Sequence, residues 1–229
     1  MFAMERDIGS KKIVFSLVLF IMFWTIITDA WGYSDFIFNK GINNIGVYIY
    51  GYVSRILWVI PAIFLIVKYS YNLSIDKTRL LSYPKFDKTL VAVLMLSMCY
   101  VIVSMFLIHK GFFFNDSEIL GLVIIKFVLV GFVEEMVFRG WGYNALVKNT
   151  THIKATFITT ILFVILHWPA YFIKLFRFGT FDFAGIIGQS TAALFWGIIF
   201  CCLLRKGKSI WNPIIAHTMY DLSYVLLVG

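Results

Sequence analysis

Apolar stretches of about twenty residues recur along the whole chain and limit what it can fold into. A helix of that length is sufficient to span a bilayer. Of the 229 residues, 61% are hydrophobic and 14% are charged, whereas a soluble domain carries about a quarter charged residues. The sequence therefore predicts an integral membrane protein, an all-α polytopic transmembrane helix bundle of about seven or eight helices.

The apolar stretches place the expected spans at 13–31, 46–67, 89–108, 119–147, 155–173, 185–204 and 209–228. A further short or re-entrant element has room in 32–45 or 172–184. Pro61 and Pro169 lie inside spans, where neighbouring helices can compensate for the lost backbone hydrogen bond. No linker or internal repeat divides the chain, so residues 1–229 are expected to form a single integral membrane domain.

Lysine and arginine are distributed unevenly between the two ends of these spans. Thirteen lie in the N-terminal segment and in the second, fourth and sixth loops, and four lie in the other loops. Because cytoplasmic loops carry the excess of positive charge in membrane proteins, the N-terminus is expected to be cytoplasmic and the C-terminus outside. This topology also explains the net charge of +8 without nucleic-acid binding.

The fourth span contains two adjacent carboxylates, Glu134 and Glu135, followed by Arg139. An acidic residue near the bilayer centre costs roughly 2.5 to 3.5 kcal/mol and indicates a functional site. Glu135 and Arg139 are four residues apart, in the order that favours an ion pair. Glu134 is turned by about 100° from Glu135, so it faces a different neighbour. We assign Glu134 to the chemistry and Glu135 with Arg139 to the scaffold, although the sequence alone also permits the reverse.

Three further polar residues lie inside later spans: His167, His217 and Asp221. His217 and Asp221 are four residues apart and share a helix face. Measured from the cytoplasmic ends of their spans, these three residues and Glu134 lie about 12 to 20 Å deep. Because they occupy one layer on three helices, we expect them to meet in a cavity, which is expected to open toward the cytoplasm.

This set of residues is suited to hydrolysis. A carboxylate in a poorly solvated pocket can take a proton from water and return it. Neutral histidines can stabilise an oxyanion or hold a metal, and Glu134, His167 and His217 would be the ligands of a zinc ion, the one cofactor considered. The H-E-x-x-H motif of many zinc proteases is absent from the sequence. Mechanisms with and without zinc therefore both stay open.

Other polar residues are given structural roles. Arg55 is expected to extend toward the interface or pair within the bundle, and Lys126 to reach the outer interface. His109 and His152 lie in or beside loops, and the sequence identifies no partner for either.

The motifs resemble those of the CPBP (CAAX protease and bacteriocin-processing) intramembrane proteases, also called the Abi or type II CAAX prenyl endopeptidase family. The family pattern is E-E-x-x-x-R, then F-x-x-x-H, then H-x-x-x-N or a similar residue, on successive helices. The chain carries Glu134-Glu135 with Arg139, then Phe163 with His167, then His217 with Asp221. The resemblance covers about residues 119–225.

The resemblance implies a membrane-embedded, metalloendopeptidase-like protease that acts on a membrane-associated peptide or protein. Glu134 would activate water, and His167 and His217 would bind the oxyanion or a metal. Asp221 stands where the family often has Asn; an ionised Asp cannot donate to an oxyanion, so it would orient His217 or help hold a metal. A bacterial cell membrane is the expected location.

Two rival functions remain open. The first is a non-catalytic bacteriocin self-immunity or regulatory membrane protein, which would not need Glu134 or His167 for its effect. The second is a small transporter or proton-relay protein, because intramembrane carboxylates and histidines also serve that purpose.

Overall fold

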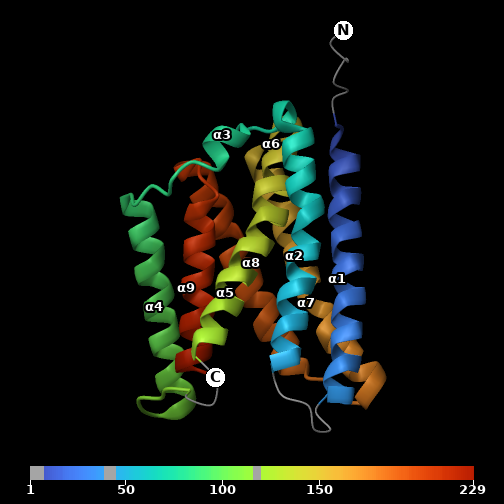
Figure 1. Cartoon of the computed structure of the whole chain (residues 1–229). Coiled ribbons are helices and arrows are strands. Elements are labelled where there is room, and N and C mark those ends of the chain that lie inside the picture. Colours follow the sequence, from blue (N-terminus) through green and yellow to red (C-terminus); the bar gives the residue numbers. More distant parts are fainter. Residues whose placement is uncertain (1–7, 39–44, 116–119) are drawn as a thin grey trace.

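A computed structural model describes residues 8–38, 45–115 and 120–229. Within these ranges all regular secondary structure is helical and no strand occurs. Long helices lie side by side along a common direction, with the start of the first helix at one end of the bundle and the C-terminus at the other (Figure 1). The predicted all-α helix bundle is confirmed.

A long helix overlaps each of the expected spans. The long helices are α1 (Ser10–Phe38), α2 (Ile45–Lys68), α4 (Lys88–His109), α5 (Leu120–Glu135), α7 (His152–Phe178), α8 (Phe183–Gly207) and α9 (Trp211–Leu227). Short elements connect them: η1 (Ser70–Asn72), α3 (Lys77–Leu80), the π-helix η2 (Met136–Tyr143) and α6 (Asn144–Asn149).

Five of the helices in the described ranges are long and apolar enough to cross a membrane: α1, α2, α4, α7 and α8. The expected span 119–147 is divided into α5, η2 and α6, which follow one another without a loop. Because α7 continues to Phe178, the stretch 172–184 holds no separate element. Of the stretch 32–45, residues 39–44 lie outside the described residues.

Local sequence signals determine where these helices begin and end. The side chain of Asp87 accepts a hydrogen bond from the backbone of Leu90 at 2.9 Å, and that of Asp182 from Gly185 at 2.7 Å, so both cap helix N-termini. Gly179 ends α7 in the left-handed conformation, at φ 66°. Pro61 and Pro169 both lie inside helices, as expected.

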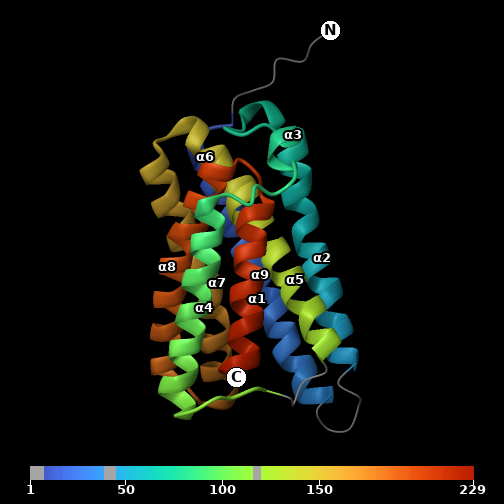
Figure 2. The same ribbon diagram turned by 90° about the vertical axis from the view of Figure 1, so that its left-hand side faces the viewer.

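Helix α5 packs against α9 and α2, and α7 packs against α8 and α1. Two buried tryptophans hold α1 against α2 and η2. Trp58 of α2 donates to the backbone oxygen of Phe20 at 2.9 Å, and Trp141 of η2 donates to Ser16 at 2.9 Å. Figure 2 shows the same bundle from the side, where α4 and α9 remain neighbours.

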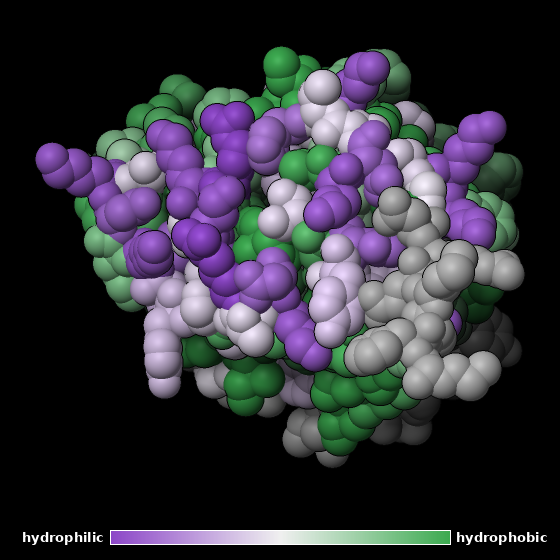
Figure 3. All heavy atoms as spheres, turned by 90° about the horizontal axis from the view of Figure 1, so that it is seen from above, coloured by the Kyte–Doolittle hydropathy of each residue, from purple (hydrophilic) through white to green (hydrophobic). Residues whose placement is uncertain are grey.

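One end of the bundle, called here the basic end, carries α3, α6 and the first turns of α1, α4 and α7 (Figure 1). Seen from this end, hydrophilic side chains cover much of the surface (Figure 3). Asn144 holds the connection between α2 and α4 there, by accepting from the backbone of Ile75 at 2.7 Å and donating back to it at 2.8 Å. Asn212 binds the backbone of Lys85 in the same way. The opposite end, called the far end, carries the start of α8 and the C-terminus.

Candidate active site

The paired glutamates are the last residues of α5, immediately before the π-helix η2. The Glu135 side chain is fully buried, and that of Glu134 is 12% exposed. A π-helical turn is rare and occurs often at functional sites. This π-helical segment was not predicted from the sequence.

Glu135 and Arg139 form the ion pair that their spacing predicts. Nη1 of Arg139 lies 2.9 Å from Oε1 of Glu135, and both side chains are fully buried. Nη2 of Arg139 donates to the backbone oxygen of Gly197 at 3.3 Å, and the guanidinium lies 4.3 Å from the centre of the Phe163 ring. This pair therefore links the end of α5 to α7 and α8.

His217 of α9 lies among carboxylates. Its Nδ1 is 2.9 Å from Oε1 of Glu135, the oxygen that also contacts Arg139. Its Nε2 is 3.3 Å from Oδ2 of Asp221 and 3.8 Å from Oε2 of Glu134. The ring also stacks on Phe200, with 4.9 Å between the ring centres. The imidazole is therefore held from both nitrogens and from one face.

His167 lies one turn beyond Phe163 on α7. Its Nδ1 is 2.8 Å from the backbone oxygen of Phe163, and the edge of one ring meets the other at 4.9 Å. Because a carbonyl oxygen can only accept, Nδ1 carries the hydrogen of this bond and Nε2 is the nitrogen left for a ligand.

A cavity of about 750 Å³ brings the predicted layer together. Glu134, His167, His217 and Asp221 all line it. Glu135 and Arg139 do not; they lie behind its wall and contact His217 and the helix backbones. The four residues on three helices thus line one cavity, as their similar depths predict.

The direction of this cavity differs from the expectation. Its lining includes Asp182, Gly185 and Gly229, which lie at the start of α8 and at the C-terminus. The cavity therefore extends toward the far end of the bundle, away from the end that the charge distribution predicts to be cytoplasmic. The depth of each residue within its own helix does not indicate toward which end of the bundle the cavity extends.

Arg55 of α2 also lines the cavity, together with Lys126. Nη1 of Arg55 donates to the backbone oxygen of Gly51 at 3.0 Å, and its guanidinium lies 5.4 Å from the Trp24 ring centre. From the sequence, we expected structural roles only for both basic residues. A charge inside an apolar span was the signal that could have identified them as residues of the site.

The site does not fit a zinc ion held by Glu134, His167 and His217. Among the described residues, no group of three His, Cys, Asp or Glu side chains is arranged to hold a metal. Nδ1 of His217 lies 2.9 Å from Glu135 and its Nε2 lies 3.3 Å from Asp221, so both ring nitrogens are next to carboxylate oxygens.

The family comparison agrees with the motifs. Residues 116–223 match the family described as type II CAAX prenyl endopeptidase Rce1-like. All six candidate residues fall inside the matched segment: Glu134, Glu135, Arg139, His167, His217 and Asp221. No curated protein and no solved structure matches the chain at a significant level. With its apolar helices, the chain is an integral membrane protein, and its segment 116–223 is similar to the type II CAAX prenyl endopeptidase family.

Proposed function

We propose that the chain is an intramembrane endopeptidase that hydrolyses a peptide bond of a membrane-associated protein or peptide, with Glu134 as the general base. The similarity to this family implies a protease of the CAAX endopeptidase kind. The observation that carries the assignment is the different surroundings of the paired glutamates. Glu134 lines the cavity, whereas Glu135 is fully buried and bound to Arg139 and His217.

Glu134 would begin the reaction by taking a proton from a water molecule in the cavity. The resulting hydroxide attacks the carbonyl carbon of the scissile peptide bond and forms a tetrahedral oxyanion. Glu134 then gives the proton to the leaving nitrogen as the carbon–nitrogen bond breaks. The products are a carboxylic acid and an amine, and Glu134 returns to its starting state.

The histidines would stabilise the oxyanion and orient the general base. When its Nε2 is protonated, His167 can donate a hydrogen bond from that atom to the oxyanion, because Nδ1 is already bound to Phe163. His217 is held by Glu135 and Asp221, and its Nε2 lies 3.8 Å from Glu134, so it orients the base. We therefore assign to Asp221 the role of positioning His217.

The arrangement of the side chains that could bind a metal supports a mechanism without one. His217 binds carboxylates through both nitrogens, and no metal-holding triad occurs among the residues described. Stabilisation of the oxyanion then depends on hydrogen-bond donors of the chain, which typically supply about 2.7 to 4 kcal/mol each.

The distribution of charge supports a cytoplasmic N-terminus, and a bacterial cell membrane is the location that we propose. The basic end carries the first turn of α1 and the connections that hold most of the lysines and arginines. Since the cavity extends toward the far end, substrate would enter from the bilayer or from the outer side.

Cleavage of a quenched membrane-peptide library by protein in nanodiscs tests this proposal. We expect cleavage by the wild type and a loss of about 10²- to 10⁴-fold in Glu134→Gln. Asp29→Asn is the matched control, because Asp29 is paired with Arg177 outside the cavity. Equal cleavage by Glu134→Gln and wild type would contradict the role of Glu134. A folded wild type without any cleavage would favour a binding-only protein.

A further inference from the structure

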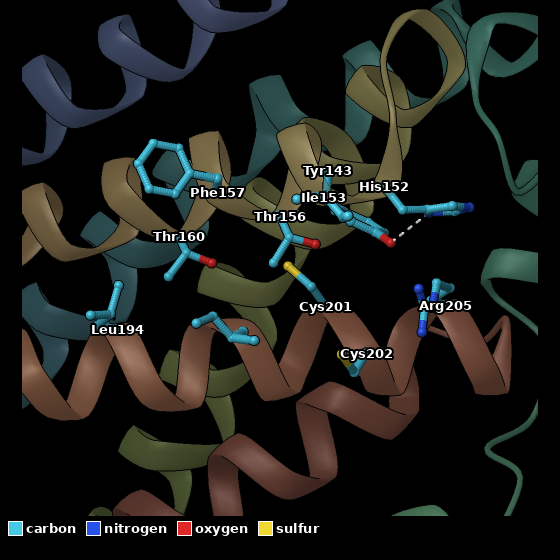
Figure 4. Close-up of a pocket in the computed structure, with 11 residues that line it drawn as sticks. Tyr143, His152, Ile153, Thr156, Phe157, Thr160, Leu194, Cys201, Cys202 and Arg205 are labelled. Atoms are coloured by element: carbon cyan, nitrogen blue, oxygen red, sulfur yellow. Dashed lines mark hydrogen bonds between the residues drawn. The ribbon is translucent and has the colours of Figure 1, made fainter.

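A second cavity, of about 340 Å³, lies between α7 and α8 near the basic end (Figure 4). It shares no lining residue with the active-site cavity. Its size is in the range of ligand pockets, and its wall is almost entirely apolar apart from one end. It is therefore a separate feature of the protein surface.

The polar end of this cavity is formed by Tyr143, His152 and Arg205. The hydroxyl of Tyr143 lies 3.0 Å from Nδ1 of His152, which is a partner that the sequence did not identify. Arg205 points to the same end, as Figure 4 shows. Within the described residues, Arg205 has no carboxylate within ion-pair distance. A cation is thus available there for a ligand.

The start of α7 adds to the positive potential at this end. His152 is the first residue of a helix of 27 residues, and the first turn contains no acidic side chain. A helix N-terminus carries a partial positive charge and favours phosphate groups. The guanidinium and the helix end therefore both favour an anion at the mouth of the cavity.

The other end of the cavity is apolar and faces the surrounding lipid. Phe157, Leu194 and Ile198 line it, with exposed fractions of 66%, 41% and 44%. Figure 4 shows Phe157 and Leu194 at the end away from Arg205. An occupant must therefore combine an anionic group at the membrane interface with an apolar chain directed toward the bilayer interior.

We propose that this cavity binds one anionic phospholipid of the bilayer. Its phosphate contacts Arg205 and His152, and an acyl chain lies along Phe157, Leu194 and Ile198. Arginine matches phosphate oxygens in geometry as well as in charge. Because the cavity is separate from the active-site cavity, the proposal does not depend on peptidase activity.

Native mass spectrometry of the purified protein with phosphatidylglycerol and with phosphatidylcholine of the same chains tests the proposal. We expect one tightly bound phosphatidylglycerol, preferred by about 10-fold or more over phosphatidylcholine, since one charged hydrogen bond has that effect. Equal retention of both lipids would overturn the proposal.

A matched pair of variants locates the site. Arg205→Gln and Lys206→Gln each remove one exposed positive charge from neighbouring positions, and only Arg205 lines the cavity. We expect Arg205→Gln to remove the preference and Lys206→Gln to keep it. Equal losses of preference in both variants would indicate a general basic surface and would contradict a specific site at Arg205.

A third variant, Ile198→Trp, fills the lipid-facing end of the cavity and leaves the polar end intact. It should weaken binding of the phospholipid, and unchanged binding would contradict the placement of the acyl chain.

Discussion

The Nδ1 atom of His217 lies 2.9 Å from Oε1 of Glu135, and this contact joins α9 to the end of α5. The same oxygen accepts from Arg139 at 2.9 Å. Glu135 is therefore the common partner of two basic groups and has no contact with the cavity. The two neighbouring carboxylates therefore differ: Glu135 holds the helices of the site together, and Glu134 lines the cavity.

Replacing each glutamate should have a different effect on stability. Glu135→Gln leaves the buried guanidinium of Arg139 without its carboxylate, a change that typically costs about 3 to 5 kcal/mol. Glu134→Gln should change the free energy of unfolding much less, because Glu134 has only the 3.8 Å contact to His217 among the ion pairs of the described residues. Thermal unfolding followed by tryptophan fluorescence measures both. A larger loss of stability in Glu134→Gln would contradict the assignment of roles.

Removal of metal ions should leave the proposed peptidase active. The reason is that His217 directs both ring nitrogens at carboxylates and no metal-holding triad occurs in the described ranges. Protein dialysed against a strong chelator should cleave a membrane peptide at the rate of untreated protein. An activity that is lost on dialysis and returns with zinc would contradict the metal-independent mechanism.

The helices were predictable because the bilayer imposes their length. The expected span 89–108 corresponds to Lys88–His109, and 185–204 to Phe183–Gly207. The pairs Glu135–Arg139 and His217–Asp221 were predictable for a similar reason, since residues four apart in a helix are always neighbours.

Other features depend on packing between helices and were not accessible from sequence. The span 119–147 was expected to be one continuous helix, but η2 interrupts it with a π-helical segment. The choice between Glu134 and Glu135 depends on where α9 places His217. The position of Arg55 in the cavity likewise depends on how α2 lies against α5.

The proposed orientation predicts which loops are accessible from outside the cell. Tyr83 lies in the connection at the basic end and Phe112 in the loop at the far end, with exposed fractions of 92% and 79%. In a background without the native cysteines, Phe112→Cys should react with a membrane-impermeant maleimide in intact cells. Tyr83→Cys should react only after permeabilisation. The reverse pattern would place the N-terminus outside.

Gly131 allows α5 to approach α9 closely, and this approach determines the contact between Glu135 and His217. A Cβ atom at Gly131 would collide with Oγ1 of Thr218 and would lie 3.1 Å from the Thr218 backbone nitrogen and 3.3 Å from the Ile214 oxygen. Gly131→Ala therefore requires the Thr218 side chain to turn away and the backbone of α9 to shift slightly away from α5. Adding volume to a packed interior typically costs about 1 to 3 kcal/mol.

The matched control is Gly121→Ala on the same helix, where a Cβ would meet no atom within 4 Å. Alanine favours a helix over glycine by about 1 kcal/mol, so Gly121→Ala should be neutral or stabilising. Gly131→Ala should lower both the unfolding temperature and the rate of peptide cleavage, because the His217 ring then moves away from Glu135 and Glu134. If Gly131→Ala left cleavage and stability at the level of Gly121→Ala, close contact between α5 and α9 would not be required for the site.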